Sequence, residues 1–115
     1  MGEIKNITAK ILAFRAERDW QQFHNHKDVA LSLVLEAAEV LEHFQWKSAA
    51  EVEAHGRDAK DELADELADV AYYLFELAHD LQIDIPKAMS VKMKKNALKY
   101  PVAKCKGRHT KYNQL

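Results

Sequence analysis

The sequence contains few of the residues that build turns and cross-links. Its 115 residues include only three glycines, two prolines and a single cysteine. So few glycines and prolines leave little turn chemistry for a many-stranded sheet, and runs of β-branched residues are absent as well. One cysteine excludes an intrachain disulfide framework and is typical of a reducing compartment. We therefore expect a chain built from long helices.

Long apolar runs are also missing. No stretch approaches the roughly 18 apolar residues of a membrane span, and the N-terminal segment MGEIKNITAKILAF has no apolar block of the kind found in signal peptides. We expect a cytoplasmic protein with no membrane partner. The formal net charge is −1, which gives no reason to expect nucleic-acid binding. Acidic residues nevertheless crowd positions 51–69, and basic residues crowd positions 87–111.

Apolar residues at helical spacing predict four helices. They cover about residues 4–18, 29–45, 58–81 and 86–99. Asp28 is the expected N-cap of the second helix. The segment KSAAEVEAHGRD is expected to be a polar connection with a short helical turn at 49–54 and a stop at Gly56. The prediction is one all-α domain, a compact four-helix bundle over residues 1–100, followed by a basic tail over 101–115 without apolar periodicity.

The second predicted helix, which includes LSLVLEAAEVLEHFQW, carries its charge in an unusual way. On a wheel of about 100° per residue, four polar side chains share an arc about 60° wide. They are Ser32, Glu36, Glu39 and His43. Apolar residues cover most of the remaining circumference, whereas a surface helix usually has a limited apolar stripe and a broad polar face. Glu42 falls outside this arc and is expected to reach solvent. We predict a helix that is buried on most sides, with one narrow acidic face.

The third predicted helix carries a matching acidic face. Seven polar residues share an arc about 100° wide. They are Asp58, Glu62, Asp65, Glu66, Asp69, Tyr73 and Glu76. Taken alone, such a face is typical of a solvated helix surface. If the two acidic faces meet in one bundle, however, four or more carboxylates converge, and only cations make that arrangement tolerable. Oxygen ligands favour Mg²⁺ or Mn²⁺ over zinc or copper.

Two other metal sites fit the sequence less well. A ferritin-like di-iron bundle requires a Glu-x-x-His pair on each of two helices, and Glu76 with His79 is the one such pair in the sequence. Zinc held by His24 and His26 would need further His or Cys ligands at suitable spacing. The other histidines are scattered, and Cys105 is remote. Carboxylate-bound Mg²⁺ therefore remains the metal hypothesis that the sequence favours.

Five sequence blocks, taken in order, resemble the all-α nucleoside triphosphate pyrophosphohydrolases of the MazG type. E-A-A-E at 36–39 and E-L-A-D at 66–69 resemble the E-x-x-E and E-x-x-D signature of that family. The flanking blocks resemble its small dCTP pyrophosphatase branch. They are ERDWQQFH at 17–24, FQWK at 44–47 and KMKKNALKYP at 92–101. The similarity covers about residues 14–101, which is most of the chain.

This resemblance implies Mg²⁺-dependent hydrolysis of a nucleoside triphosphate between its α- and β-phosphates. The products are the monophosphate and pyrophosphate, the expected substrate is dCTP or a modified dCTP, and the expected role is house-cleaning of nucleotide pools. The resemblance also implies a homodimer, or a homotetramer built from dimers, with active sites beside the four-helix core. Two alternatives stay open, a non-catalytic helical regulatory module and a nucleotide sensor that uses the tail as a lid.

The resemblance also assigns residues. The metal ligands and catalytic carboxylates that carry over are Glu36, Glu39, Glu66 and Asp69, and we nominate Glu39 to act on the attacking water. The positions expected around the base and sugar are Trp20, His24, Trp46 and Tyr73. The positions expected near the phosphates and sugar are Lys92, Asn96, Lys99 and Tyr100. Lys99 stands where relatives often have arginine, which does not favour bidentate phosphate recognition there. The basic segment KCKGRHTKY at 104–112 resembles a tail that folds over the nucleotide.

Overall fold

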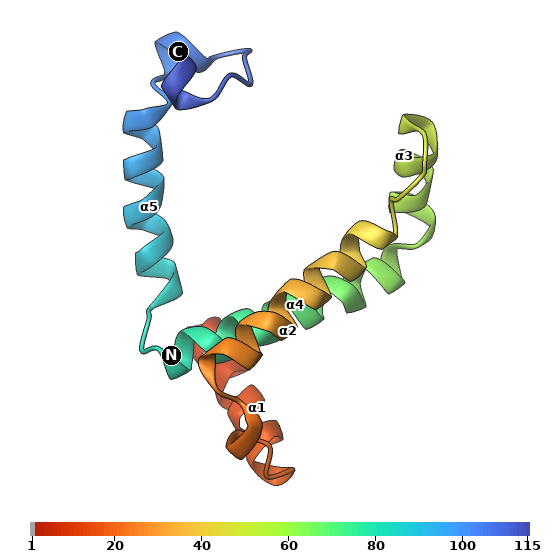
Figure 1. The fold of residues 1–115 in the computed structure, drawn as a ribbon, viewed down its shortest axis with the longest axis vertical. Coiled ribbons are helices and arrows are strands. Elements are labelled where there is room, and N and C mark those ends of the chain that lie inside the picture. Colours follow the sequence, from red (N-terminus) through yellow and green to blue (C-terminus); the bar gives the residue numbers. More distant parts are fainter. Residues whose placement is uncertain (1) are drawn as a thin grey trace. The chain divides into compact units, whose positions relative to one another are not determined.

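The computed structural model describes residues 2–115, and within this range the chain is helical with no strand. The elements are α1 (Glu3–Glu17), η1 (Gln21–Phe23), α2 (His26–Glu42), α3 (Ala49–Asp58), α4 (Lys60–Asp80), α5 (Ile85–Lys99), α6 (Val102–Cys105) and η2 (Tyr112–Gln114) (Figure 1). The all-α prediction is confirmed. Across residues 2–115, no helix combines the length and apolarity needed to cross a membrane. The cytoplasmic location stays a prediction.

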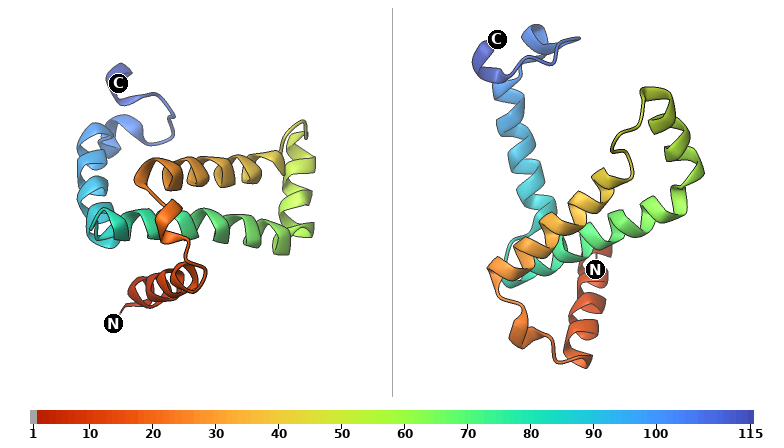
Figure 2. Two further views of the ribbon diagram at one scale, coloured as in Figure 1. Left: turned by 60° about the horizontal axis from the view of Figure 1, so that its bottom comes forward. Right: turned by 45° about the vertical axis from the view of Figure 1, so that its right-hand side comes forward.

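The helices form two units, one that ends at Gln82 and one that covers Ile83–Leu115. In the first unit, α4 packs against α1, α2 and α3. Figure 2 shows α2 and α4 side by side and antiparallel, with α3 joining them at one end. This pairing places the acidic stretch of α2 next to the acidic stretch of α4. The predicted domain boundary at residue 100 stays a prediction.

The N-terminus of α2 differs from the prediction. Asn25, not Asp28, is the N-cap, and its Oδ1 accepts a hydrogen bond from the backbone N–H of Asp28 at 2.8 Å. The helix consequently begins at His26, three residues earlier than expected. Asn and Asp are about equally good N-caps, so residue type alone did not distinguish the two positions. Asp28 instead lies in the first turn, where a negative charge stabilises the helix dipole.

The connection between the two long helices is also more ordered than predicted. Residues Ala49–Asp58 form a full helix that continues through Gly56, so the expected stop there is wrong. A capping box starts this helix. Ser48 Oγ accepts from the backbone N–H of Glu51 at 3.2 Å, and Glu51 Oε1 accepts from the backbone N–H of Ser48 at 3.0 Å. The S-x-x-E pattern at 48–51 was the sequence signal for this start.

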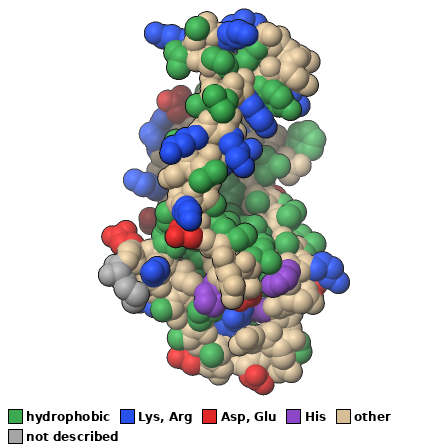
Figure 3. All heavy atoms as spheres, turned by 90° about the vertical axis from the view of Figure 1, so that its left-hand side faces the viewer, with side chains coloured by type: hydrophobic (Ala, Val, Ile, Leu, Met, Phe, Trp, Pro, Cys, Tyr) green, Lys and Arg blue, Asp and Glu red, His purple; other side chains and the backbone are tan. Residues whose placement is uncertain are grey.

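The second unit consists of α5 and the C-terminal segment. Asp84 caps α5 by accepting from the Lys87 N–H at 3.1 Å, and proline occupies the first turn, as expected. The segment after α5 was expected to be a basic tail without apolar periodicity, and it contains the short helices α6 and η2. The ring of Tyr112 lies edge-on to Tyr100 with centroids 6.1 Å apart, and Lys99 Nζ is 4.7 Å from the same ring. Figure 3 shows lysine and arginine side chains spread over this unit.

The first unit buries little apolar surface within one chain. Its buried apolar residues are Ile11, Val29 and Ala78. Large apolar side chains on α2 are instead exposed, at fractions of 55% for Leu31, 64% for Val34, 58% for Leu35 and 68% for Leu41. The prediction that α2 is buried on most sides is therefore wrong for a single chain, because α4 covers only one side of it. The apolar circumference itself is present but faces outward.

Candidate active site

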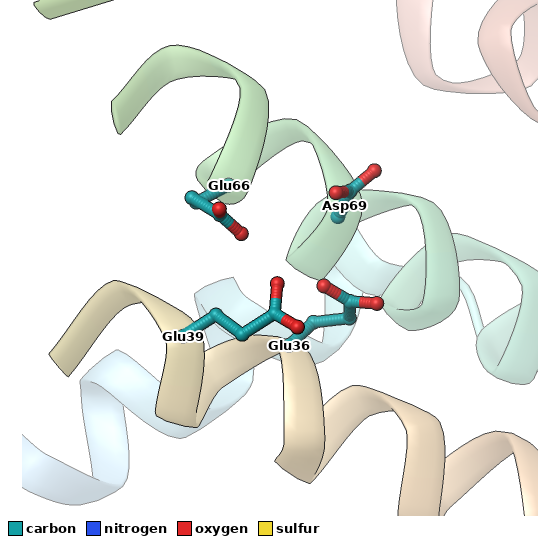
Figure 4. A group of neighbouring side chains, drawn as sticks. All are labelled: Glu36, Glu39, Glu66 and Asp69. Carbon is teal, nitrogen blue, oxygen red and sulfur yellow. The ribbon is translucent and has the colours of Figure 1, made fainter. Parts of the chain in front are cut away.

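Four carboxylates converge between α2 and α4. Glu36 and Glu39 come from α2, and Glu66 and Asp69 come from α4. One carboxylate oxygen of each lies within 4.8 Å of the corresponding oxygens of the other three. In Figure 4 the α2 side chains reach across the space between the helices toward the α4 side chains. The two acidic faces therefore meet, although the role of the four residues as metal ligands stays a prediction.

Helical spacing explains how each helix contributes a pair. Side chains three residues apart lie on the same face of a helix, so E-x-x-E and E-x-x-D each present two carboxylates in one direction. The antiparallel packing of α2 on α4 then turns the pairs toward each other. Glu36 and Glu66 are half-buried, whereas Glu39 and Asp69 are exposed. The cluster is thus partly sheltered and still reachable from solvent.

The electrostatics of the cluster are unfavourable for four ionised carboxylates. Burial raises the pKa of Glu36, and the neighbouring carboxylates, first of all Glu39, raise it further. The pKa of Glu66 is raised by its hydrogen bond with Glu39, by burial and by like charge. Within the described chain, Glu36 Oε2 and Glu66 Oε2 are buried and have no hydrogen-bond partner. Leaving a buried carboxylate oxygen without a partner costs free energy of folding. A cation bound between the helices would supply the missing partner.

The donor set fits a hard divalent cation. All four side chains offer carboxylate oxygen, which is the ligand type that Mg²⁺, Mn²⁺ and Ca²⁺ prefer, and the group contains no nitrogen or sulfur donor. Zinc sites in proteins usually include histidine or cysteine, and neither belongs to this group. The cluster could therefore hold a hard metal ion.

A histidine pair lies at the edge of the cluster. His43 Nε2 is 3.9 Å from Glu66 Oε1, and His43 Nδ1 is 2.8 Å from Nε2 of His55 on α3. His43 belongs to the polar arc predicted for α2, but the contribution of α3 was missed because only a short helical turn at 49–54 was expected there. His55 of α3 is therefore connected to Glu66 of the cluster through His43.

Three of the residues expected near the base and sugar lie along one side of the first unit. Trp20 is 41% exposed, and its ring centroid is 6.2 Å from that of His24. Tyr73 is half-buried on α4, one turn after Asp69. Burial raises the pKa of the Tyr73 hydroxyl, and the charge of Glu36 on α2 raises it further. Their role in binding stays a prediction.

Trp46 differs from these residues. Its side chain is 93% exposed, and its backbone has φ of 65°. A non-glycine residue rarely adopts this left-handed conformation, and a tryptophan is seldom left in solvent without a role. Within the described part of a single chain, Trp46 has no aromatic partner. It is available to contact a ligand or another molecule.

A buried charged network between α1 and α4 was not predicted. Arg15 Nη1 donates to Glu76 Oε1 at 3.1 Å and to Asp80 Oδ2 at 2.9 Å, and Nη2 donates to Asp80 Oδ1 at 3.2 Å. His24 Nδ1 is hydrogen-bonded to Glu76 Oε1. These contacts occupy Glu76 and so remove it from any di-iron site with His79. The available signal was Arg15 itself, a charged residue one turn after Ile11 on the apolar face of α1.

The four residues expected near the phosphates belong to the second unit. Lys92, Asn96 and Lys99 are exposed on α5, and Tyr100 is its C-cap. Asn96, Lys99 and Tyr100 are grouped near the C-terminal end of the helix, whereas Lys92 lies about two turns earlier. Lys99 and Tyr100 also contact Tyr112, so the C-terminal segment is tied to the same end of α5.

The chain is similar to known proteins over most or all of its length. The MazG-like family matches residues 31–115 of the chain. The chain is 43% identical over 117 aligned residues to dCTP pyrophosphatase 1 of Rattus norvegicus and 39% identical to dCTP pyrophosphatase 1 of Homo sapiens. Each alignment covers 100% of this chain and 67% of the relative.

A solved structure is also similar. It is the crystal structure of a pyrophosphatase from Archaeoglobus fulgidus, which matches with a TM-score of 0.84 and 35% sequence identity. The match covers 88% of this chain and 94% of the archaeal one.

Proposed function

The chain belongs to the MazG-like family, and we propose on this premise that it is a nucleoside triphosphate pyrophosphohydrolase acting on dCTP or a modified dCTP. The reaction adds water to phosphorus and breaks the P–O bond between the α- and β-phosphates, which yields the monophosphate and pyrophosphate. Its role is the house-cleaning of nucleotide pools. The observation that carries this proposal is the convergence of four carboxylates in a chain related over its whole length to dCTP pyrophosphatases.

We assign the metal site to Glu36, Glu39, Glu66 and Asp69, with Mg²⁺ as the ion and Mn²⁺ as its substitute. The all-oxygen donor set and the two unpartnered buried oxygens support this assignment. When bound, Mg²⁺ neutralises phosphate charge and makes a coordinated water more acidic. Without such a cation, a triphosphate would be repelled by the four carboxylates.

Glu39 is the proposed base for the attacking water. Glu39 raises the pKa of both Glu36 and Glu66 by hydrogen bonding and like charge, and one of its oxygens lies within 4.8 Å of an oxygen of each. Glu39 is also the more exposed of the two α2 carboxylates, which leaves it accessible to a water molecule. Its function is to accept a proton from that water while the other three carboxylates hold their positions.

The remaining contacts are assigned by region. Around the base and sugar we place Trp20, His24, Trp46 and Tyr73. Near the phosphates and sugar we place Lys92, Asn96, Lys99 and Tyr100. The lysines would stabilise the charge that develops on the departing pyrophosphate. The aromatic rings of the two tryptophans offer flat apolar faces on which a base can stack.

We further propose that the protein works as a homodimer or a homotetramer. The exposed leucine and valine side chains of α2, together with Leu67 at 57% exposure on α4, support this proposal. Soluble monomers rarely expose so many neighbouring large apolar residues. A second copy would cover this surface.

The test is a substrate screen with purified protein. Each canonical dNTP and a set of 5-modified dCTP analogues is incubated with Mg²⁺, and pyrophosphate release is measured. We expect dCTP or a 5-modified dCTP to have the highest kcat/KM, and Glu39→Gln to lower kcat by at least about 100-fold, a typical contribution of a general base.

Glu42→Gln is the matched control for this screen. Glu42 lies on the same helix three residues from Glu39, is exposed, and does not belong to the four-carboxylate cluster. It should retain wild-type turnover. Absence of pyrophosphate release from every nucleotide by the wild-type protein would refute the proposed activity.

A further inference from the structure

Glu76 is one of two charged residues that are buried in the described chain, and its exposed fraction is 0%. Its Oε1 accepts from Arg15 and from His24 Nδ1. Arg15 also has a bidentate contact with Asp80, so it is bonded to two residues of α4 without any contribution from His24. The anchoring of α1 therefore does not require His24. The contact between Glu76 and His24 needs another explanation.

The contact determines which nitrogen of His24 carries the hydrogen. A carboxylate that is salt-bridged to an arginine can only accept, so Nδ1 of His24 must be the donor. A neutral imidazole has a single N–H, and which nitrogen carries it is set by the hydrogen bond that the ring makes. With Nδ1–H directed at Glu76, Nε2 is left with a free lone pair.

The position of His24 relates this lone pair to the proposed nucleotide site. Asp69, Tyr73 and Glu76 follow one another at spacings of four and three residues, so they share one face of α4. His24 is bonded to the last of them, about 10 Å along the helix from Asp69 at 1.5 Å per residue. The ring of Trp20 lies beside His24. His24 therefore lies about two helical turns beyond Asp69, beside Trp20.

We propose that Glu76 is a positioning residue that fixes His24 with its hydrogen on Nδ1, so that Nε2 accepts a hydrogen bond from the nucleotide. The donor on the nucleotide is the exocyclic amine of the base or the hydroxyl of the sugar. This inference rests on the proposed function, since it concerns the same nucleotide site. Arg15 holds the Glu76 carboxylate through a hydrogen bond of its own, at 3.1 Å.

Two amide substitutions of His24 test the roles of Nδ1 and Nε2 separately. In His24→Asn the amide occupies the place of Nδ1, so the contact with Glu76 is kept and nothing replaces Nε2. In His24→Gln the amide reaches the place of Nε2 and the contact with Glu76 is lost. We expect the KM for dCTP to rise about tenfold in His24→Asn and less than about threefold in His24→Gln, the loss expected for one hydrogen bond. The thermal stability should fall more in His24→Gln.

The KM values of the variants should change more than their kcat values, because the four carboxylates are unaltered and His24 is bonded about 10 Å along α4 from Asp69. If His24→Asn retains the wild-type KM while His24→Gln loses affinity, His24 serves only to satisfy Glu76 and the proposal is overturned.

A comparison of dCTP, dUTP and ddCTP identifies which group of the nucleotide donates the hydrogen bond to His24 Nε2. In dUTP a carbonyl replaces the exocyclic amine of dCTP, and in ddCTP the sugar hydroxyl is missing. If Nε2 accepts from the amine, His24→Asn lowers kcat/KM for dCTP and ddCTP but not for dUTP. If it accepts from the hydroxyl, the loss appears with dCTP and dUTP but not with ddCTP. An equal loss with all three nucleotides would contradict a hydrogen bond to either group.

A double-mutant cycle tests the role of Glu76 itself. Glu76→Gln should raise the KM for dCTP in the wild-type background and have no further effect in His24→Asn, where Nε2 is already missing. Independent, multiplicative effects on KM would contradict positioning. Asp80→Asn is the matched control, because it weakens the anchor of Arg15 without touching His24. It should lower the melting temperature and leave the KM unchanged.

The tautomer can be read directly by ¹H–¹⁵N NMR of the full-length protein labelled at histidine. We expect the His24 ring to carry hydrogen on Nδ1 and not on Nε2 at neutral pH, and to lose this preference in Glu76→Gln. A ring protonated on Nε2 overturns the proposal. If no nucleotide yields pyrophosphate, the proposed function fails while this spectrum still tests Glu76. If dCTP is hydrolysed and His24→Asn leaves KM unchanged, only the present inference fails.

Discussion

Glu36 and Glu66 each have a buried carboxylate oxygen without a hydrogen-bond partner in the described chain, and both have raised pKa values. A carboxyl group whose pKa is higher in the folded than in the unfolded protein binds more protons when folded. Between the two pKa values, the free energy of unfolding therefore falls as the pH rises. The destabilisation is absent below the ordinary pKa of 4.5 and complete above the raised values. The metal-free site thus destabilises the fold at neutral pH.

We predict that Glu36→Gln stabilises the metal-free protein in a pH-dependent way, since it removes one charge from the cluster. The melting temperature of the variant minus that of wild type, measured with EDTA, should be close to zero near pH 4.5. It should become positive by a few degrees toward neutral pH. With excess Mg²⁺ the sign should reverse, because only the wild-type cluster keeps all four ligands.

Glu42→Gln controls for the general effect of removing a glutamate from α2. It is exposed and outside the acidic face, so its melting-temperature difference should not depend on pH or Mg²⁺. A pH-independent difference in Glu36→Gln as well would show that the carboxylates do not interact strongly in the folded state.

At the scale of single residues, the sequence correctly predicted the position of a side chain where that position depends on one helix alone. The wheel placed Glu36 with Glu39 and Glu66 with Asp69, because residues three apart share a face whatever the helix packs against. It also placed Glu76 on the acidic face of α4. It did not predict that Glu76 is buried against Arg15, because that depends on where α1 crosses α4. Contacts between distant segments leave little periodic signal in either segment.

At the scale of elements, α3 is the helix that sequence periodicity missed. It has ten residues, is rich in charged and polar side chains, and contains Gly56, which costs a helix interior about 1 kcal/mol relative to alanine. Its capping box at Ser48 and Glu51 and its packing on α4 compensate for this weakness. The long helices α1, α4 and α5 were predicted well because their apolar residues recur over several turns. For α2 the predicted span of about 29–45 was three residues late at both ends, and its start was displaced because two good N-caps lie close together.

Gly56→Ala should therefore stabilise the protein by about 0.5–1 kcal/mol. An alanine Cβ at this position meets no atom within 4 Å, and the backbone there is helical, so nothing opposes the gain in helix propensity. Chemical denaturation of the two proteins would give the difference in the free energy of unfolding.

Ser48→Ala provides the opposite change in the same helix. It removes the acceptor for the Glu51 N–H and should cost about 1 kcal/mol. If neither substitution changes global stability, α3 unfolds independently of α4, and its packing does not contribute to the fold as described here.

At the scale of the whole molecule, a single chain leaves much of its apolar surface uncovered. The first unit buries three apolar residues, while four large apolar side chains of α2 are each more than half exposed. Each would stabilise the protein by about 1.5–3 kcal/mol if fully buried. The sequence predicted this apolar circumference correctly but could not show what covers it, because an interface between copies leaves the same pattern as a core.

The proposed oligomer can be tested through Leu41, which is 68% exposed on α2. Leu41→Asp places a charge in the middle of the surface that a second copy would cover, and an unpaired charge in such an interface costs several kcal/mol. We expect the wild type to run at a multiple of its 13.2 kDa chain mass in light scattering, and the variant to shift toward the single-chain mass. Lys27→Asp is the control, since Lys27 is a polar, 84% exposed side chain in the first turn of the same helix. If the wild type runs at 13.2 kDa across the working concentration range, the apolar surface is not a self-interface. The exposure of Trp46 would then have to be explained by the nucleotide alone.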